Sequence, residues 1–162
     1  MSIIGKRIIN LSGALCCAGM MALALYSQHV LLLDPCPLCI LQRIAVIALG
    51  VTFLVIAVHN PQQIGSRIYA AISVVLATLG AAIAGWHVHL QNLPADEVPS
   101  CGPGLEYMVE NFPLRDVLGL ILKGSGECAE ISWRFIGLTM PTWVIVCLLG
   151  LASIAVWNNL RR

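Results

Sequence analysis

Four long apolar stretches divide the sequence, and polar residues or prolines mark their ends. The stretches run roughly over residues 8–26, 40–58, 68–86 and 140–157. A helix needs about 20 largely apolar residues to cross a bilayer. Asn60-Pro61 ends the second stretch, while Pro141 and Trp143 open the fourth, as expected for proline in a first helical turn and tryptophan at a membrane interface. The pattern predicts four transmembrane helices.

The composition agrees with a membrane protein and leaves little room for a soluble domain. Hydrophobic residues make up 59% of the 162-residue chain and charged residues only 10%, against about 25% charged in soluble domains. We therefore expect one all-α membrane domain over residues 1–162, a four-transmembrane-helix bundle. Ala22-Leu23-Ala24 resembles a signal-peptidase site, but the apolar run before it exceeds the about 7–15 residues of a signal peptide. We expect the first helix to be retained.

Charge indicates the orientation of the bundle. Four spans place both termini and the 59–67 loop on one side. That side holds five basic residues and no acid: Lys6, Arg7, Arg67, Arg161 and Arg162. Short loops rich in Lys and Arg stay in the cytoplasm. We expect cytoplasmic termini, with the loops at about 27–39 and 87–139 facing outward.

The long outer loop contains an amphipathic pattern. Its apolar residues recur at helical spacing: Leu114, Val117, Leu118, Ile121 and Leu122. This spacing predicts a short surface helix. We expect it to lie on the membrane surface, and the alternative is packing on top of the bundle. Gly102-Pro103-Gly104 and Gly124-Ser125-Gly126 are expected to be flexible joints.

The predicted topology divides the seven cysteines into two groups. Cys16, Cys17 and Cys147 lie within spans, where a free cysteine behaves as a small hydrophobe, so we expect packing roles. The other four lie outside or at the outer edge of the bundle: Cys36, Cys39, Cys101 and Cys128. An even number of cysteines in an outward compartment is compatible with disulfides.

The Cys36-Pro37-Leu38-Cys39 motif leads directly into the second span. Pro37 suits a first helical turn, so Cys36 is expected to cap the helix and Cys39 to lie in its first turn. Free N–H groups and the helix dipole favour a thiolate there, and Arg43 shares the face of Cys39. The alternatives are an inert disulfide and an arginine that reaches the lipid headgroups. A four-cysteine zinc site is not expected, because zinc ribbons use two C-x-x-C knuckles.

The second pair suggests a route for electrons. A loop disulfide of Cys101 and Cys128 could take electrons from a soluble partner and pass them to Cys36 and Cys39 by thiol–disulfide exchange. No nucleotide-binding motif is present, and the lipid-soluble two-electron acceptor that fits is a quinone. His87 and Gln91, one turn apart, could bind its carbonyl.

The remaining histidines, His29, His59 and His89, are interpreted as polar residues at helix ends. A haem held by two of the outer histidines His29, His87 and His89 stays open as an alternative.

Two motifs resemble those of the disulfide bond formation protein B (DsbB) family. They are residues 28–39 with Gln42-Arg43, and Gly126-Glu127-Cys128-Ala129-Glu130 followed by Trp133, Phe135, Gly137-Leu138 and Met140-Pro141. The resemblance extends over the whole chain. It implies a protein-disulfide:quinone oxidoreductase of the bacterial inner membrane, with periplasmic cysteines. No nucleic-acid partner is expected.

The resemblance also implies a role for each site residue. Cys101 would be attacked by a reduced, periplasmic DsbA-like thioredoxin-fold oxidase, and Cys128 would link transiently to Cys36. Cys39 would face ubiquinone or menaquinone, with Arg43 stabilising its thiolate and His87 and Gln91 nearby. The oxidised pairs would be Cys36–Cys39 and Cys101–Cys128.

Two other thiol-oxidase hypotheses remain. One is a DsbB paralogue dedicated to a specialised oxidase or substrate. The other is a protein of the vitamin K epoxide reductase type, but there the helix-borne C-x-x-C follows the loop pair, whereas here it comes first. A non-enzymatic haem-binding membrane protein is the alternative from another class.

Overall fold

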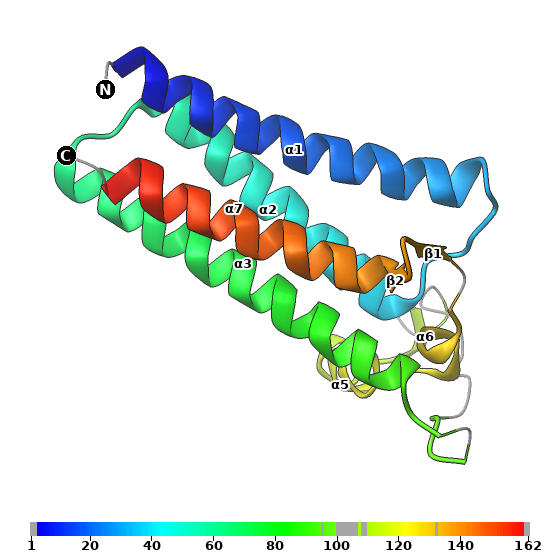
Figure 1. Ribbon diagram of the computed structural model, residues 1–162. Helices are drawn as coiled ribbons and strands as arrows, with labels where there is room; N and C mark the ends of the chain where they lie inside the picture. The colour runs from blue at the N-terminus through cyan, green and yellow to red at the C-terminus, as the bar shows by residue number, and fades with distance from the viewer. Residues whose placement is uncertain (1–2, 95, 100–106, 108–109, 132, 161–162) are drawn as a thin grey trace.

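Four long helices form an antiparallel bundle in the computed structural model, which describes residues 3–94, 96–99, 107, 110–131 and 133–160. They are α1 (Ile3–His29), α2 (Pro37–His59), α3 (Gln63–Gln91) and α7 (Met140–Leu160). The first turn of α1 and the last turn of α7 lie at the same end of the bundle (Figure 1). The four predicted spans are confirmed, and each helix extends past its apolar stretch because polar residues join the end turns.

The ends of α2 follow from its sequence. Cys36 is the N-cap, in an extended conformation, and Pro37 occupies the first helical position. At the other end Asn60 adopts the left-handed conformation, with φ 47°, and donates its N–H to the Ile56 carbonyl at 2.9 Å. Asparagine tolerates this C-terminal conformation, and Pro61 cannot continue the helix. At the start of α2, Cys36 and Pro37 therefore place the C-x-x-C motif at one end of the bundle.

The helices pack in the order α1, α2, α3, α7, with α1 also touching α7. Val46, Leu49 and Phe53 of α2 form the centre of the core. Their partners are Cys17 from α1, Ala77 from α3, and Leu148, Leu151, Ala152 and Ala155 from α7. A Cβ at Gly50 would lie 2.9 Å from the Cys17 Cβ, so α1 and α2 approach closely at this point.

Large apolar side chains also cover the outside of all four helices. Examples are Leu15 at 64%, Val51 at 54%, Leu79 at 57% and Val146 at 51% exposed. Soluble monomers rarely expose so continuous an apolar surface, and all four helices are long and apolar enough to cross a membrane. The chain is a multi-pass membrane protein.

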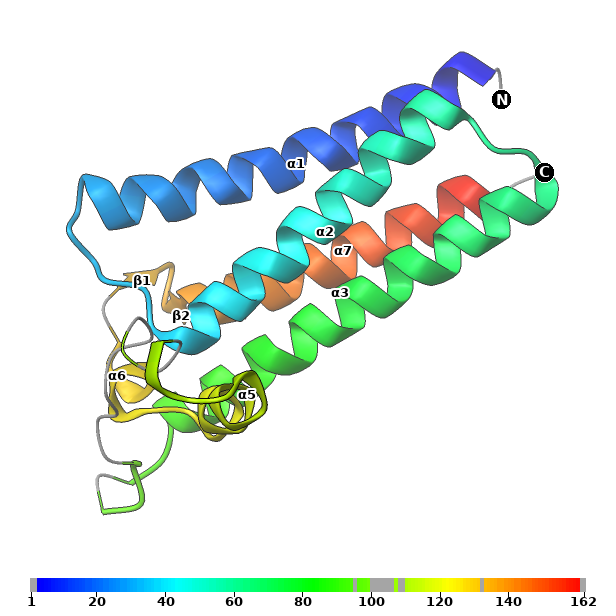
Figure 2. The ribbon, with the colours of Figure 1, turned by 180° about the vertical axis from the view of Figure 1, so that it is seen from behind.

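The segment between α3 and α7 folds over one end of the bundle (Figure 2). It contains α5 (Leu114–Lys123), the single turn α6 (Gly126–Ala129), and the strands β1 (Arg134–Phe135) and β2 (Leu138–Thr139). The strands are antiparallel, with Arg134 opposite Thr139. The first predicted joint, Gly102-Pro103-Gly104, lies outside the described residues.

The predicted amphipathic helix is confirmed as α5, and its buried residues pack on protein. Val117 and Ile121 are 2% and 7% exposed and contact a cluster that includes Leu38 and Leu90. The expectation of an apolar face turned to lipid does not hold for these two residues, because the ends of α2 and α3 offer them an apolar surface. This is the alternative placement, on top of the bundle.

The three cysteines within the spans have different surroundings. Cys17 is 2% exposed and belongs to the core, as predicted. Cys147 is half-buried, whereas Cys16 is exposed. The expectation of a packing role was therefore wrong for Cys16, because adjacent residues of α1 point to different sides and only Cys17 faces α2.

Candidate thiol site at the start of α2

Cys36 and Cys39 hydrogen-bond to each other at the start of α2. The Cys36 thiol donates to the Cys39 Sγ at 3.0 Å, and the Cys39 backbone N–H donates to the Cys36 Sγ at 3.4 Å. Both are free thiols here. Since a disulfide has an S–S distance of about 2.05 Å, a movement of about 1 Å would bring the sulfurs to bonding distance. The predicted cap and first-turn positions are confirmed.

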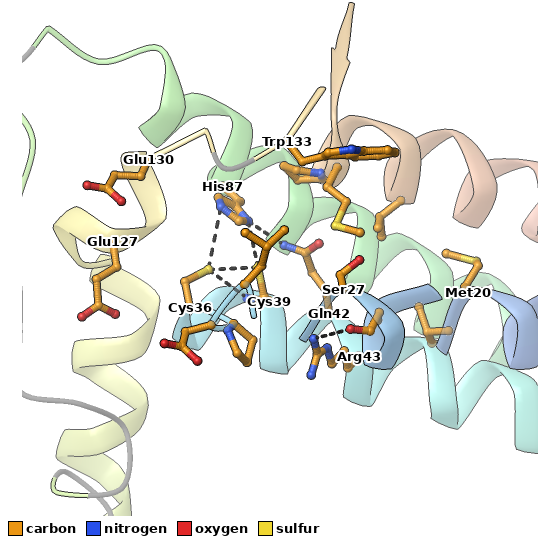
Figure 3. A pocket seen from close by; sticks show the side chains of 18 of the residues that line it. Met20, Ser27, Cys36, Cys39, Gln42, Arg43, His87, Glu127, Glu130 and Trp133 are labelled. Carbon is orange, nitrogen blue, oxygen red and sulfur yellow. Dashed lines mark hydrogen bonds between the residues drawn. The ribbon is translucent and has the colours of Figure 1, made fainter. Parts of the chain in front are cut away.

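His87 of α3 lies against both sulfurs (Figure 3). Its Nε2 is 3.8 Å from the Cys36 Sγ, and its Nδ1 is 4.0 Å from the Cys39 Sγ. The Gln42 amide nitrogen lies 3.0 Å from Nδ1. With the amide donating to Nδ1, a neutral imidazole carries its proton on Nε2 and presents it to Cys36. Both His87 and Gln42 are buried, so this arrangement is shielded from solvent.

The sequence motif Gln42-Arg43 did not predict this role for Gln42. It follows Cys39 by three residues and lies on the same side of α2. The signal that could have found it is a polar amide inside an otherwise apolar span, because such residues usually face the bundle interior and have a function.

Arg43 points from α2 towards α1. Its guanidinium donates to the Gln28 Oε1 at 2.6 Å and to the Ala24 carbonyl at 3.1 Å. These protein acceptors hold the cation in place, which differs from an arginine that reaches only lipid headgroups. The contact between Gln28 and Arg43 could not be predicted, since the two residues are 15 positions apart on different helices.

A cavity of about 140 Å³ lies between the cysteines and Arg43. Cys36, Cys39, His87 and Gln91 line it, together with Arg43. Apolar side chains complete the wall: Met20, Met21, Val46, Trp133, Met140 and Val144. The cavity therefore combines an apolar interior with a few polar groups, as small-molecule sites do.

Gln91 contributes an unused acceptor to this cavity. Its Oε1 is buried and has no hydrogen-bond partner among the residues that the structure describes. A buried polar group without a partner is costly, and a turn of the Gln91 side chain towards the cavity would let a ligand hydroxyl satisfy it. The predicted residues Arg43, His87 and Gln91 are thus brought together around one cavity.

Cys128 of α6 packs directly against this site. Its side chain is fully buried and shares an apolar cluster with Cys36, Leu38 and Leu90. A hydrogen bond with Cys36 raises the pKa of the Cys128 thiol, and burial raises it further. Cys128 therefore stays protonated while the Cys36 thiol is beside it. Cys101 lies outside the described residues, so its pairing with Cys128 stays a prediction.

The other outer histidines are not directed at the cavity. Among the described residues, His87 is the only histidine in its lining. His29 is exposed at the end of α1, and the His89 ring packs on Trp86 with centroids 5.2 Å apart. This arrangement does not favour a haem held by two histidines.

Comparison with known proteins gives the family. The family model described as disulfide bond formation protein DsbB matches residues 6–158. A relative from Nitrosococcus oceani, named disulfide bond formation protein B, is 53% identical over 152 residues, covering 94% of this chain and 90% of its own. A relative of the same name from Methylococcus capsulatus is 48% identical over 164 residues, covering both chains completely. The chain therefore belongs to the DsbB family of proteins for disulfide bond formation.

Proposed function

We propose that this protein oxidises a DsbA-like, periplasmic thioredoxin-fold protein and passes the electrons to quinone in the bacterial inner membrane. One observation carries the proposal. The Cys36 and Cys39 sulfurs lie 3.0 Å apart at the edge of the cavity that Arg43, His87 and Gln91 also line, with Cys128 packed against Cys36. A thiol relay and an acceptor site therefore meet at one point.

The relay consists of two exchange steps that conserve electrons. In the first, the partner dithiol reduces a Cys101–Cys128 disulfide and leaves as a disulfide. In the second, the Cys101 and Cys128 thiols reduce a Cys36–Cys39 disulfide through a transient Cys128–Cys36 bond. Each exchange moves two electrons by attack of a thiolate on a disulfide sulfur. The packing of Cys128 on Cys36 supports the second step.

The size of the cavity supports a quinone ring as its occupant. A cavity of about 150 Å³ can hold a benzene ring, and this one has a volume of about 140 Å³. A bound quinone supplies a two-electron, two-proton acceptor for the Cys36 and Cys39 thiols. Arg43 provides a fixed positive charge beside it, and the free Gln91 Oε1 can accept from a hydroxyl of the reduced ring. The apolar methionines and Val144 would exclude water.

The relay requires the thiol site to face the periplasm. The basic residues near both termini and in the short 59–67 loop favour a cytoplasmic location for that end of the bundle. The start of α2, α5 and α6 lie at the opposite end (Figure 2). A soluble periplasmic oxidase would then meet the segment that carries Cys101 and Cys128.

Anaerobic turnover of the purified protein tests this function. Reduced DsbA-like protein and a soluble ubiquinone or menaquinone analogue are supplied, and partner thiols and quinone absorbance are followed together. We expect one quinone reduced for each partner dithiol oxidised. No turnover with either type of quinone would contradict the assignment. Turnover with one specialised partner but not with general DsbA-like proteins would identify a dedicated paralogue.

A further inference from the structure

We propose that the reduced thiol site also binds a soft metal ion, Zn²⁺ or Cu⁺, through Cys36, Cys39 and His87, and that the ion blocks oxidation of the pair. The site itself follows from side-chain geometry. The inhibition of turnover by the bound ion, called the brake below, rests on the proposed function.

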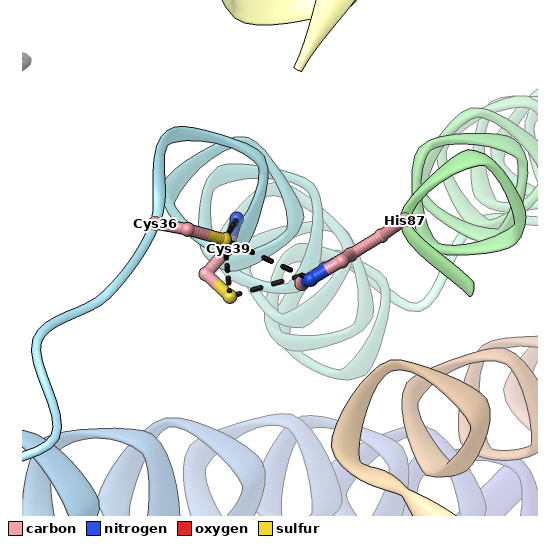
Figure 4. A group of neighbouring side chains, drawn as sticks. All are labelled: Cys36, Cys39 and His87. Atoms are coloured by element: carbon pink, nitrogen blue, oxygen red, sulfur yellow. Dashed lines mark hydrogen bonds between the residues drawn. The ribbon is translucent and has the colours of Figure 1, made fainter. Parts of the chain in front are cut away.

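The three side chains are already arranged as a ligand set (Figure 4). One ligand atom from each lies within 4.8 Å of the other two. Zinc binds thiolate sulfur at about 2.3 Å and imidazole nitrogen at about 2.0–2.1 Å, so tetrahedral ligand pairs lie about 3.8 Å apart for two sulfurs and about 3.6 Å for sulfur and nitrogen. The observed distances are 3.0 Å between the sulfurs and 3.8 Å from the Cys36 Sγ to the His87 Nε2. The remaining ligand pair lies within 4.8 Å, so shifts of about 1 Å would complete the geometry.

The donor types select the metal. Two sulfurs and one imidazole are the ligands of soft or borderline ions such as Cu⁺ and Zn²⁺, whereas Mg²⁺ and Ca²⁺ prefer oxygen. Three protein ligands leave one position of a zinc ion open for water, and the cavity borders the ligands. The sequence did not predict a zinc site made of four cysteines, because zinc ribbons use two C-x-x-C knuckles. Here His87 takes the place of the loop pair, which only the packing of α3 on α2 reveals.

Gln42 can support the histidine as a ligand. In the metal-free site its amide nitrogen faces the His87 Nδ1 at 3.0 Å. Rotation of the amide by 180° would present its oxygen, which accepts a proton from Nδ1 when Nε2 binds the ion. Metal-bound histidines nearly always donate their second N–H in this way.

The charge around the cavity favours entry of a cation. Asp34, Glu127 and Glu130 line it, and Arg43 is the one basic residue among the described lining residues besides His87. Figure 3 shows both glutamates near the Cys36 side of the cavity. A concave site lined by one sign of charge concentrates the opposite ion.

Metal binding and oxidation exclude each other. Binding through both sulfurs releases two thiol protons to water and changes no oxidation state. A Cys36–Cys39 disulfide has no thiolate to offer, so only the reduced site binds. While the ion is held, the two sulfurs cannot form the disulfide, and electrons from the partner stop at this pair.

Cobalt provides a direct probe of the site. The full-length protein with Cys101→Ser and Cys128→Ser is reduced, freed of reductant under argon and titrated with Co²⁺. We expect a thiolate-to-cobalt charge-transfer band and visible bands of tetrahedral cobalt at one equivalent, and displacement by Zn²⁺. The oxidised sample of the same protein should show neither band. This comparison needs no further variant, so absence of the bands from the reduced protein would overturn the proposal.

Variants identify the ligands. Cys36→Ser and Cys39→Ser should abolish the charge-transfer band, whereas Cys17→Ser and Cys147→Ser, the matched controls, should keep it. Gln42→Ala should weaken zinc affinity about 10–100-fold, and His87→Ala should weaken it more. A band that persists in Cys36→Ser would place the ion elsewhere and overturn the assignment.

The brake is measured separately. Zn²⁺ should stop turnover of the wild-type protein, and a chelator should restore it; binding without inhibition would refute the brake alone. Because the cobalt titration contains neither partner nor quinone, its result does not depend on the proposed function.

Discussion

The two ends of the bundle both bury polar side chains but use them differently. At the end near the termini, three residues from three helices form a network of amide and hydroxyl groups. The Asn159 side chain donates to the Ala155 carbonyl at 2.9 Å and to the Asn10 Oδ1 at 3.4 Å, and the Ser66 hydroxyl donates to the Asn159 carbonyl at 2.6 Å. These groups join α1, α3 and α7 and contain nothing that exchanges electrons.

At the other end the buried polar groups surround sulfur. Gln42 and His87 bond to each other, His87 contacts Cys36 and Cys39, and Gln91 lines the cavity with an unpaired Oε1. The comparison indicates that the first network holds helices together, while the second positions reactive atoms beside an open space. Substitutions at one end should therefore affect stability, and substitutions at the other should affect chemistry.

Cysteine-to-serine substitutions should produce the largest difference in turnover between the thiol site and the rest of the bundle. Cys36→Ser and Cys39→Ser should reduce turnover with the DsbA-like partner and quinone to the uncatalysed background, because each removes one atom of the disulfide. Cys16→Ser, Cys17→Ser and Cys147→Ser should retain nearly full turnover per folded molecule. Equal loss in both sets would mean that the in-span cysteines take part in electron transfer.

Arg43 tests whether a fixed cation matters at the thiol end. Arg43→Ala removes the fixed positive charge beside the cavity, and we expect quinone turnover to fall about 10–100-fold, which corresponds to about 1.4–2.8 kcal/mol. Arg43→Lys should recover part of this loss, because it restores charge without the forked geometry. Steady-state kinetics with varied quinone measure the effect. A variant that loses its fold but keeps its turnover per folded molecule would show that Arg43 serves only to join α1 and α2.

Substitutions at the end near the termini should change the free energy of unfolding and leave the quinone kinetics unchanged. Asn159→Ala removes the hydrogen bonds to Ala155 and Asn10, and side-chain hydrogen bonds between membrane helices contribute about 0.6 kcal/mol on average and at most about 1.7 kcal/mol. We expect a decrease of this size in the free energy of unfolding, measured in mixed micelles with increasing denaturing detergent. Ser153→Ala is the control, because its hydroxyl donates to the Leu149 carbonyl within the same helix. A change in quinone kinetics with Asn159→Ala would break the separation between the two ends.

The smallest expected effect concerns the pH dependence of Cys128. The hydrogen bond with Cys36 and burial raise its pKa, and only the thiolate reacts with alkylating reagents. In the reduced, folded protein the alkylation profile of Cys128 should therefore lie at higher pH than in the unfolded chain. Mass spectrometry after timed alkylation measures it. Cys36→Ala should move the profile back to lower pH, and a folded profile at or below that of the unfolded chain would contradict the assigned contact.

The local features of both ends could be predicted from the sequence. Apolar run lengths give the four spans, and Pro37 after Cys36 gives the cap and the first-turn position of Cys39. These depend on neighbours in the chain. The network of Asn10, Ser66 and Asn159 joins residues up to 149 positions apart, and it could not be foreseen because one sequence does not specify which faces of two helices meet.

The same limit applies to the thiol site. The sequence placed His87 at the outer end, but its contact with the sulfurs depends on how α3 rotates against α2. For α5, the amphipathic pattern predicts an apolar face but does not distinguish lipid from protein as its partner. Val117 and Ile121 pack on protein because they cover Leu38 and Leu90 at the end of the bundle.

A single-turnover reaction shows whether quinone takes its electrons from Cys36 and Cys39. The protein with Cys101→Ser and Cys128→Ser is reduced, mixed anaerobically with a soluble quinone analogue and quenched with acid at a series of times. Quinone loss is followed by absorbance and the Cys36–Cys39 disulfide by mass spectrometry. Our account predicts that one disulfide between Cys36 and Cys39 appears for each quinone reduced, at the same rate. Reduced quinone without this disulfide, or a stable dithiol in excess quinone, would contradict it.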